Sequence, residues 1–468
     1  MPPRRTRAPE RPVFVTLDGK RILADENASL VSALVGAGHL ELARSPKFHR
    51  PRGPSCMRGG CDGCLLRIDG NPNVMACGIS AREGTRCERQ NVILSSKLDL
   101  LRATDWFFPN GMNHHEMFAG VPGVQSVMLA FARRVSGLGE LPDAEARARE
   151  PRREGVKTLK HDVLVVGGGP AGLVTAAALA IKGLSVVLVD EAARAGGSLL
   201  SFPPKARVAL GRGGEAHTVD IDETRARLVD AAAEAGVALQ LGTTALGVLE
   251  GGDWLVDHRE EGLRRIEARA HVVASGAHDG VAMFVGNDMP GVISARAAGR
   301  LLREGVLVGE RPVVAGEGPF ADAFAAAAES EGAKVTRVAL DAIEGVRGLS
   351  RVRSVLIRKP HHPGHRGHAG HENEQLACDA LVIDAPCAPA FEVSGEAGAK
   401  LGRDAAGYPV LVDEDGLAAD PSRARPLGAV GEVTGGPLDP IRFAAVAARL
   451  SDRVARLLDA GSPTGESA

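Results

Sequence analysis

The alternation of hydrophobic and polar residues changes character along the chain, and each change predicts a different kind of structure. Residues 12–24 alternate around an Asp-Gly turn, which predicts a β-hairpin. Residues 26–38 then have the spacing of a short helix that ends at a glycine, and residues 65–78 alternate again around a second Asp-Gly pair. Hairpin, helix and hairpin predict a small domain with both α and β structure, which we place at residues 12–95.

A different pattern begins at residue 161. Residues 161–191 contain an apolar strand, a glycine turn, an Ala-rich helix and a second apolar strand, which is the βαβ unit of a parallel sheet. A fainter copy covers residues 311–340. We therefore expect an α/β and α+β multidomain protein with two Rossmann-like domains. The expected parts are a disordered tail at 1–11, the small domain at 12–95, a helical segment and linker at 96–158, a dinucleotide-binding domain at 159–292 and 389–460, and a second Rossmann-like domain at 293–388.

Four of the seven cysteines follow the spacing C-x4-C-x2-C with a more distant fourth residue. They are Cys56, Cys61, Cys64 and Cys77. This spacing matches the plant-type 2Fe–2S pattern, in which four thiolates hold two irons, and glycines let the loop backbone approach inorganic sulfide. A zinc site and inert cysteines are the alternatives, whereas a disulfide framework does not suit a long chain with an odd number of cysteines. With its flanking hairpins, the loop resembles the β-grasp fold of plant-type ferredoxins.

The turn after the first strand of residues 161–191 reads G-x-G-x-x-G, with glycines at 167, 169 and 172. The first glycine makes the turn, the second lets the backbone approach a pyrophosphate, and the third allows close helix–strand packing. Asp190 ends the second strand, where an acid accepts hydrogen bonds from ribose hydroxyls, and Glu191 is the alternative. In this context the motif predicts a dinucleotide site, with a cofactor-free Rossmann shell as the alternative.

Three other features carry weaker signals. Glu317 lies in the second glycine turn, where its carboxylate would face phosphate, so a second nucleotide site and a fold that has lost it both stay open. Five histidines in residues 361–371 suggest a metal, but a Gly/Pro-rich hairpin loop is favoured. His114 and His115 are the only catalytic candidates, and a structural role is favoured for them. The catalytic residues are therefore unknown from the sequence.

Composition excludes several classes of function. The chain has 468 residues, a net charge of −2 and a mean hydropathy of −0.03, which is typical of a globular protein without a charge excess for nucleic acid. No apolar run of ~18 residues free of charges and Gly/Pro predicts a spanning helix. Free cysteines and a reducible cluster suit a cytoplasmic setting, where only a partner would hold the protein at a membrane.

Several stretches together resemble flavoprotein reductases with two dinucleotide-binding domains. They are the first glycine turn, the DEAARAGG that follows it, HVVASGAH at 271–278 and GAVGEVTGG at 428–436. The chain is more similar still to the α subunits of heteromeric amine and imino-acid oxidoreductases. This group includes sarcosine oxidase α, opine oxidase A, dye-linked proline dehydrogenase α and the cyanide synthase subunits. HRPRGPSC, DGNPNVMACG and GNDMPGVISA carry this similarity, and Glu432 stands where the family usually has Asp.

The resemblance implies cofactors and a partner. It implies FAD in the first dinucleotide fold, with NAD or ATP as alternatives in the same site, and a flavin-containing, amine-oxidising β subunit in a hetero-oligomer. The implied nucleotide-binding residues are Gly167, Gly169, Pro170, Ala171, Gly172, Asp190, Glu191, Gly276 and Glu432.

The expected function is an iron–sulfur flavoprotein subunit that relays electrons while the partner oxidises a sarcosine, proline, hydroxyproline or opine type of substrate. The final electron acceptor is unknown. The alternatives are a stand-alone NAD(P)H-dependent ferredoxin-type reductase and a mainly structural subunit that holds a nucleotide.

Overall fold

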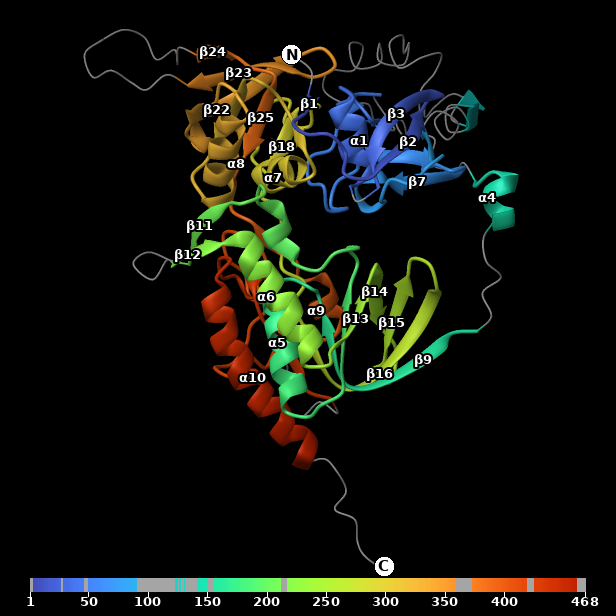
Figure 1. Ribbon diagram of the computed structural model, residues 1–468, viewed down its shortest axis with the longest axis vertical. Helices are drawn as coiled ribbons and strands as arrows, with labels where there is room; N and C mark the ends of the chain where they lie inside the picture. Colours follow the sequence, from blue (N-terminus) through green and yellow to red (C-terminus); the bar gives the residue numbers. More distant parts are fainter. Residues whose placement is uncertain are drawn as a thin grey trace, which may run out of the picture. The chain divides into compact units, whose positions relative to one another are not determined.

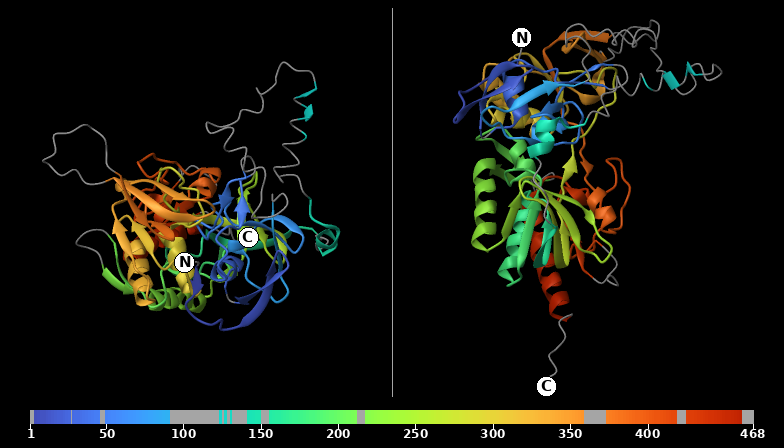
Figure 2. Two further views of the ribbon diagram at one scale, coloured as in Figure 1. Left: turned by 90° about the horizontal axis from the view of Figure 1, so that it is seen from above. Right: turned by 90° about the vertical axis from the view of Figure 1, so that its right-hand side faces the viewer.

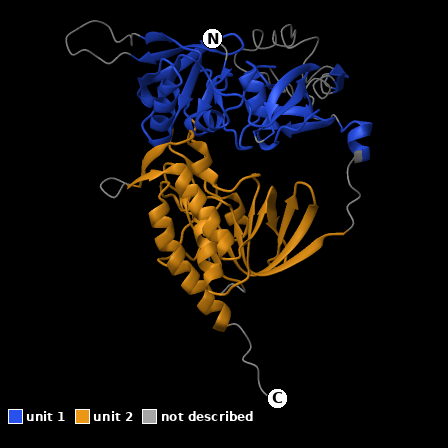
Figure 3. Ribbon diagram, in the orientation of Figure 1, with its two compact units in different colours: residues 1–151, 282–384 blue, residues 152–281, 385–468 orange. Residues whose placement is uncertain are grey.

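The computed structural model describes residues 3–26, 28–45, 49–90, 123–124, 126–127, 130, 141–149, 155–211, 217–358, 373–418 and 425–460. The chain forms two compact units, which Figure 3 shows in different colours. The first unit combines residues 1–151 with 282–384, and the second combines residues 152–281 with 385–468. Each unit therefore joins two stretches that are far apart in the sequence.

The N-terminal part of the first unit is a five-stranded sheet with one helix against it (Figure 1). The hairpin expected at 12–24 is confirmed, because β2 and β3 pair antiparallel from Pro12 to Leu17. Helix α1 begins after Ser29, whose hydroxyl accepts a hydrogen bond from the backbone of Ser32, and six of its seven residues are buried. The sheet order is β3 (Lys20–Asp25), β2 (Pro12–Leu17), β8 (Arg86–Arg89), β6 (Leu65–Ile68) and β7 (Asn71–Met75), and α1 spans Leu30–Gly36.

For residues 3–11, the structure corrects the expectation of a disordered tail at residues 1–11. Strand β1 (Arg4–Arg5) pairs antiparallel with β19 (Val306–Leu307). Arg4 also donates a hydrogen bond to the carbonyl of Glu331 at 2.6 Å, and Arg7 donates one to the carbonyl of Arg303 at 2.7 Å. The expectation came from a basic, Pro-rich composition, whereas the order comes from distant carbonyl groups that accept these hydrogen bonds.

The rest of the first unit is Rossmann-like. Its four-stranded sheet is parallel throughout, and the strand–helix–strand pattern expected at 311–340 is present as β20, α8 and β21. An antiparallel three-stranded sheet precedes the last strand, β25. The parallel sheet has the order β18 (Val292–Ser294), β25 (Ala380–Ile383), β20 (Pro312–Ala315) and β21 (Thr336–Val338). Its helices are α7 (Ala295–Arg303) and α8 (Pro319–Ser330). The antiparallel sheet contains β22 (Ile343–Gly348), β23 (Val352–Arg358) and β24 (Asn373–Ala377).

The second unit is built on a seven-stranded mixed sheet. Strand β9 lies between β10 and β16 and pairs in parallel with both, and the apolar ends of β9 and β10 are buried. Helix α10 packs against α5 (Figures 1 and 2). The sheet order is β13 (Ala238–Leu241), β10 (Val186–Asp190), β9 (Lys157–Val166), β16 (Gly262–Val273), β15 (Trp254–His258) and β14 (Thr243–Val248). Strand β27 (Leu427–Ala429) also pairs with β16. The main helices are α5 (Pro170–Ile181), α6 (Ile221–Glu234) and α10 (Pro440–Ala460).

Smaller elements complete the described chain. They are β4 (Ala43–Arg44), β5 (Pro51–Arg52), α4 (Ala144–Arg149), β11 (Arg207–Leu210), β12 (His217–Asp220), β17 (Ala277–His278), β26 (Ala388–Pro389) and α9 (Glu392–Glu396), with short 3-10 helices such as η1 (Ala76–Gly78) and η3 (Gly197–Ser201). His114, His115, the histidine tract at 361–371 and most of the segment 96–158 lie outside the described residues.

Candidate functional site

The four cysteines of the predicted cluster site come together as two pairs in the first unit. Cys56 and Cys61 lie in one loop, and the thiol of Cys56 donates to Sγ of Cys61 at 3.4 Å. Cys64 precedes β6 and forms the second hydrogen-bonded pair with Cys77, which lies in η1. None of the four is joined in a disulfide bond. The sequence spacing therefore corresponds to a real convergence of sulfur atoms from a loop and a hairpin.

Hydrogen bonds prepare one thiol of each pair for deprotonation. The hydrogen bond from Cys56 lowers the pKa of Cys61 to about 6, and the same bond raises the pKa of Cys56. In the second pair, the hydrogen bond with Cys64 lowers the pKa of Cys77 and raises that of Cys64. Cysteines bind metals as thiolates. The hydrogen bonds therefore favour the metal-binding form of Cys61 and of Cys77.

Backbone N–H groups in the loop also point at the sulfur atoms. The N–H of Gly59 donates to Sγ of Cys77 at 3.3 Å, and the N–H of Arg58 donates to Sγ of Cys56 at 3.4 Å. Gly63 is required for the tight fold, because a Cβ there would lie 1.8 Å from the carbonyl oxygen of Gly53. N–H donors to sulfur and a closely folded loop are features that stabilise iron–sulfur clusters.

The arrangement in pairs fits a cluster with two irons. In the described part of the chain, no group of three or more His, Cys, Asp or Glu side chains could hold a single metal ion. The two hydrogen-bonded pairs, Cys56 with Cys61 and Cys64 with Cys77, instead match the need of a 2Fe–2S centre for two thiolates per iron. The residues that would hold the cluster are Cys56, Cys61, Cys64 and Cys77.

The other cysteines differ from these four in their surroundings. Cys87 and Cys378 are buried, and burial raises the pKa of each thiol to about 12. Thiols in such apolar surroundings stay protonated and unreactive. Cys387 is partly exposed and lies in the second unit. The two buried cysteines therefore behave as core residues.

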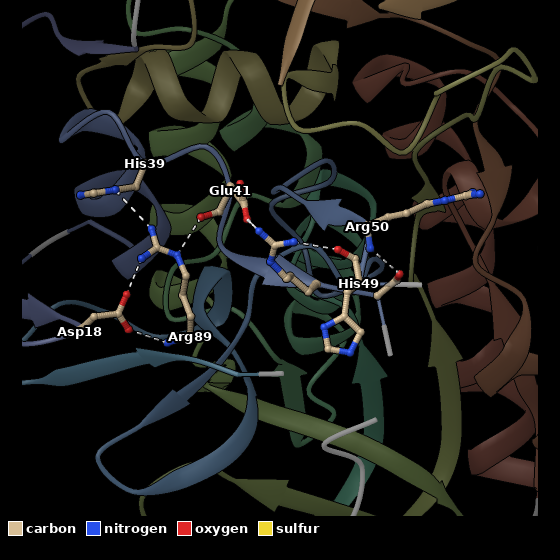
Figure 4. A network of polar contacts seen from close by, with 8 residues as sticks. Asp18, His39, Glu41, His49, Arg50 and Arg89 are labelled. Atoms are coloured by element: carbon tan, nitrogen blue, oxygen red, sulfur yellow. Dashed lines mark hydrogen bonds and ion pairs between the residues drawn. The ribbon is translucent and has the colours of Figure 1, made fainter. Parts of the chain in front are cut away.

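The chain that leads into the cysteine loop is fixed by a network of charged groups, shown in Figure 4. Arg89 on β8 forms an ion pair with Asp18 in the β2–β3 turn and donates from Nε to the carbonyl of Glu41 at 3.0 Å. The carboxylate of Glu41 accepts a hydrogen bond from Arg44 at 2.5 Å, and Arg44 donates to the carbonyl of His49 at 2.9 Å. Because Arg44 is almost fully buried, its hydrogen bonds fix the positions of Glu41 and His49 relative to each other.

The glycine turn of the second unit has the geometry of a dinucleotide site. It connects β9 to α5, and Pro170 occupies the first turn of the helix behind the N-cap residue Gly169. Gly172 packs so closely that a Cβ would lie 1.8 Å from the carbonyl oxygen of Gly167. A Cβ on Gly169, in contrast, would have no neighbour closer than 3.8 Å. The third glycine therefore serves packing, and the second leaves room in front of the helix.

The N-terminus of α5 is suited to an anion. Its first turn contains no acidic residue, and its N-cap residue provides no side-chain hydrogen bond to the helix backbone. Helix N-termini carry partial positive charge and direct N–H groups outward, which is how dinucleotide pyrophosphates are bound. This end of α5 therefore fits a dinucleotide.

Asp190 ends β10, as expected, and its carboxylate faces the turn. Its two oxygens accept hydrogen bonds from the backbone N–H groups of Gly168 at 2.5 Å and Ala192 at 2.7 Å. Glu191 is exposed. Asp190 thus shapes the turn, and its contact with a ribose stays a prediction.

Near the glycine turn, the structure adds Gly431 and Ser198, which the sequence analysis did not name, beside the expected Glu432. Gly431 packs against the first turn of α5, where a Cβ would lie 2.7 Å from Cβ of Ala171, so the late GEVTGG stretch meets the glycine turn. The following residue, Glu432, is buried and accepts a hydrogen bond from the hydroxyl of Ser198 at 2.7 Å. Ser198 directly follows the DEAARAGG stretch, so this stretch was the part of the sequence that could have indicated it. Gly276 lies in the described chain between β16 and β17, and its carbonyl accepts a hydrogen bond from Ala390.

The second glycine turn, in the first unit, is arranged differently. Oδ2 of Asp384, just after β25, accepts a hydrogen bond from the N–H of Ala321 in the first turn of α8 at 2.9 Å. A Cβ on Gly318 would lie 2.6 Å from the same oxygen, and Glu317 is exposed. The carboxylate at this helix N-terminus is therefore that of Asp384 rather than that of Glu317.

Known proteins match both parts of the chain. Residues 10–92 match the family of the 2Fe-2S iron-sulfur cluster binding domain, and residues 161–354 match that of the pyridine nucleotide-disulphide oxidoreductases. The α chain of sarcosine oxidase from Rhizobium meliloti (strain 1021) is 29% identical over 330 residues, which are 65% of this chain and 32% of that protein. Opine oxidase A from the same organism is 33% identical over 178 residues, which are 35% of each protein. The chain is therefore similar to these oxidase subunits.

These similarities agree with the resemblance inferred from the sequence. The matches support a 2Fe–2S cluster in the N-terminal domain and FAD in the flavoprotein domain. The chain spans 32% and 28% of the sarcosine oxidase α subunits of Rhizobium meliloti and Corynebacterium sp. (strain P-1), the latter being 36% identical over 320 residues. The likeness is therefore to one part of those longer proteins.

A solved structure shows the same fold. L-proline dehydrogenase from P. horikoshii superimposes with a TM-score of 0.70 at 20% sequence identity, over 98% of this chain and 76% of that one. The expected fold class, a 2Fe–2S domain followed by a Rossmann-like flavoprotein, is thus confirmed. In the described part of the chain, no helix combines the length and the apolar character that crossing a membrane requires.

Proposed function

We propose that this chain is the iron–sulfur flavoprotein subunit of a heteromeric dehydrogenase or oxidase that acts on the C–N bond of a secondary amine or imino acid. The observation that carries the proposal is the convergence of all four cysteines, in two hydrogen-bonded pairs, in a chain that also has an open glycine turn for a dinucleotide. A chain with two redox cofactors, and with no substrate site recognised among its described residues, is suited to relay electrons.

The cofactor-binding residues belong to this proposal. Cys56 and Cys61 would hold one iron of the cluster, and Cys64 and Cys77 the other. The glycine turn at 167–172 would hold the pyrophosphate of FAD at the N-terminus of α5. Pro170, Ala171, Asp190, Glu191, Gly276 and Glu432 would complete the nucleotide site. When bound, a flavin and an iron–sulfur cluster convert a two-electron oxidation into one-electron steps.

The substrate class rests on relatives. The names of the matching proteins refer to sarcosine and opine, and the solved structure with the same fold is an L-proline dehydrogenase. Sarcosine, proline and opines are all secondary amines, so the shared chemistry is oxidation next to a secondary nitrogen. We place that oxidation on a flavin-containing partner subunit, because no catalytic residue set is recognised in the described part of this chain.

The stand-alone reductase is the weaker alternative. It would need NAD(P)H at the second Rossmann-like domain, where Asp384 already presents a carboxylate to the N-terminus of α8. A negative side chain at this point would repel the phosphates of a second dinucleotide. A purely structural subunit is also disfavoured, since it has no use for four converging thiols.

The test compares the isolated chain with the complex purified after co-expression with the neighbouring gene product. Sarcosine, L-proline, hydroxyproline and an opine are each supplied with a dye as the electron acceptor. We expect amine-dependent dye reduction by the complex only. Amine oxidation by the chain alone would overturn the relay role, and NADH-driven ferredoxin reduction by the chain alone would establish the reductase instead.

A further inference from the structure

Inside the first unit, the second Rossmann-like domain contacts the cysteine loop on both sides of Cys56. The backbone N–H of Ser294, the N-cap residue of α7, donates to the carbonyl of Ser55 at 3.0 Å. Further along the same helix, Nη1 of Arg300 donates to the carbonyl of Met57 at 3.3 Å. One helix therefore holds the residues before and after a predicted cluster ligand.

Met57 adopts a conformation that its surroundings must hold. Its φ is +54°, in the left-handed region that non-glycine residues seldom adopt, and its side chain is only 1% exposed. Such conformations are unfavourable and persist where neighbouring contacts determine them. The buried side chain and the hydrogen bond from Arg300 are two such contacts. Arg300 therefore contributes to the shape of the loop between Cys56 and Cys61.

Arg300 also places a positive charge at the cysteine loop. Its guanidinium group donates to the carbonyl of Met57, the residue that follows Cys56 in the chain. A guanidinium group stays protonated throughout the physiological pH range, so this charge is permanent.

We propose that Arg300 is a positioning residue for the cysteine loop and that its charge raises the reduction potential of the cluster. Reduction adds one electron, and therefore one negative charge, to the centre that the four cysteines hold. A nearby positive charge favours the reduced form, and net charge and hydrogen bonding around the sulfurs set such potentials. The second Rossmann-like domain would thus tune the cluster. This inference rests on the proposed ligand assignment.

The experiment is a redox titration of the full-length protein with dithionite and mediators, followed by paramagnetic resonance of the reduced cluster. Arg300→Gln keeps a hydrogen-bond donor but removes the charge, so its midpoint potential should be lower than that of the wild type. Arg300→Lys keeps the charge and should stay closer to the wild-type potential. Arg303→Gln is the matched control, because it removes the same charge from the same last turn of α7 and should leave the potential unchanged.

Iron and sulfide content is measured first, because it separates the two hypotheses. A wild-type chain without a cluster would refute the ligand assignment. A full cluster in Arg300→Gln with the wild-type potential, or equal shifts in Arg300→Gln and Arg303→Gln, would refute the role of Arg300 alone. If Arg300→Gln loses its iron, Arg300→Lys decides: iron retained near the wild-type potential supports the proposal, and iron lost from both variants contradicts it.

Discussion

The carboxylate of Glu432 accepts a hydrogen bond from the hydroxyl of Ser198 at 2.7 Å, although 234 positions separate the two residues. Both are buried, and they bring the late GEVTGG stretch and the DEAARAGG stretch together behind the glycine turn. A buried carboxylate that loses a hydrogen-bond donor becomes less stable, so this pair links the stability of the second unit to its nucleotide site.

We expect Ser198→Ala to lower the free energy of unfolding by about 1–3 kcal/mol and to weaken the retention of FAD during gel filtration. Ser201→Ala is the matched control. Ser201 lies in the same 3-10 helix and is also buried, but its hydroxyl has no hydrogen-bond partner among the described residues. Equal losses in the two variants would show that Glu432 does not depend on Ser198.

The cysteine pairs predict which thiols matter for the cluster. Protein purified without oxygen should contain about two irons and two sulfides per chain and should give a rhombic paramagnetic resonance signal on reduction. Cys61→Ser should abolish this signal, because it removes one of the four thiolates that would hold the cluster. Cys378→Ser should retain it, since that thiol is buried with a raised pKa. Stoichiometric zinc without sulfide would contradict the prediction.

The glycine turn allows packing and binding to be separated. Gly172→Ala should destabilise the second unit by about 3 kcal/mol, because its Cβ would overlap the carbonyl of Gly167. Gly169→Ala has room in the fold and should cost no more than about 1 kcal/mol, but it should lose the dinucleotide if the pyrophosphate approaches this residue. The measurements are urea unfolding and identification of the nucleotide released on denaturation. A Gly169→Ala protein with its full complement of nucleotide would rule out this binding mode.

His271 makes the stability of the second unit dependent on pH. Burial, followed by the charge of Arg425, lowers its pKa from 6.5 to about 4. Its Nε2 is buried and has no hydrogen-bond partner in the described part of the chain. The unfolded chain therefore binds a proton below pH 6.5 that the folded chain does not bind until about pH 4. Its contribution to stability is complete above pH 6.5 and falls by up to about 3 kcal/mol as the pH decreases to 4.

The measurement is urea unfolding at several pH values, followed by the fluorescence of Trp254 in a Trp106→Phe background that leaves one tryptophan. His271→Phe should show a smaller loss of stability on acidification. His217→Phe, at an exposed position on β12, should keep the wild-type pH dependence. If His271→Phe responds to pH as the wild type does, another group is responsible.

The carboxylate at α8 predicts the number of bound dinucleotides. Denatured protein should release about one equivalent of dinucleotide per chain. The N-terminus of α5 is open to a pyrophosphate, whereas Asp384 accepts a hydrogen bond at the N-terminus of α8. Asp384→Asn should lower the free energy of unfolding by about 1–2 kcal/mol, since a charged acceptor becomes neutral. Two equivalents in the wild type would mean that Asp384 moves aside for a ligand.

The amino-acid order by itself determined the parts of the sites that lie close together in the chain. Three of the four cysteines fall within nine residues, and the fourth follows after a hairpin whose turn is also local. The first glycine turn and Asp190 lie in one βαβ unit, whose burial pattern makes strand, helix and strand recognisable. Short loops and repeated apolar spacing restrict such segments to one conformation, so their form could be predicted.

Only the tertiary structure decided which distant groups complete these segments. No local pattern shows that Ser198 meets Glu432, that Arg300 holds the loop at Met57, or that Asp384 reaches the N-terminus of α8. The ordering of β1 against β19 is of the same kind. Each partner lies more than 50 residues away along the chain, and its position depends on how whole sheets and helices pack. Hydrogen bonds and charges act over a few ångströms in space, so only the folded chain could specify these pairs.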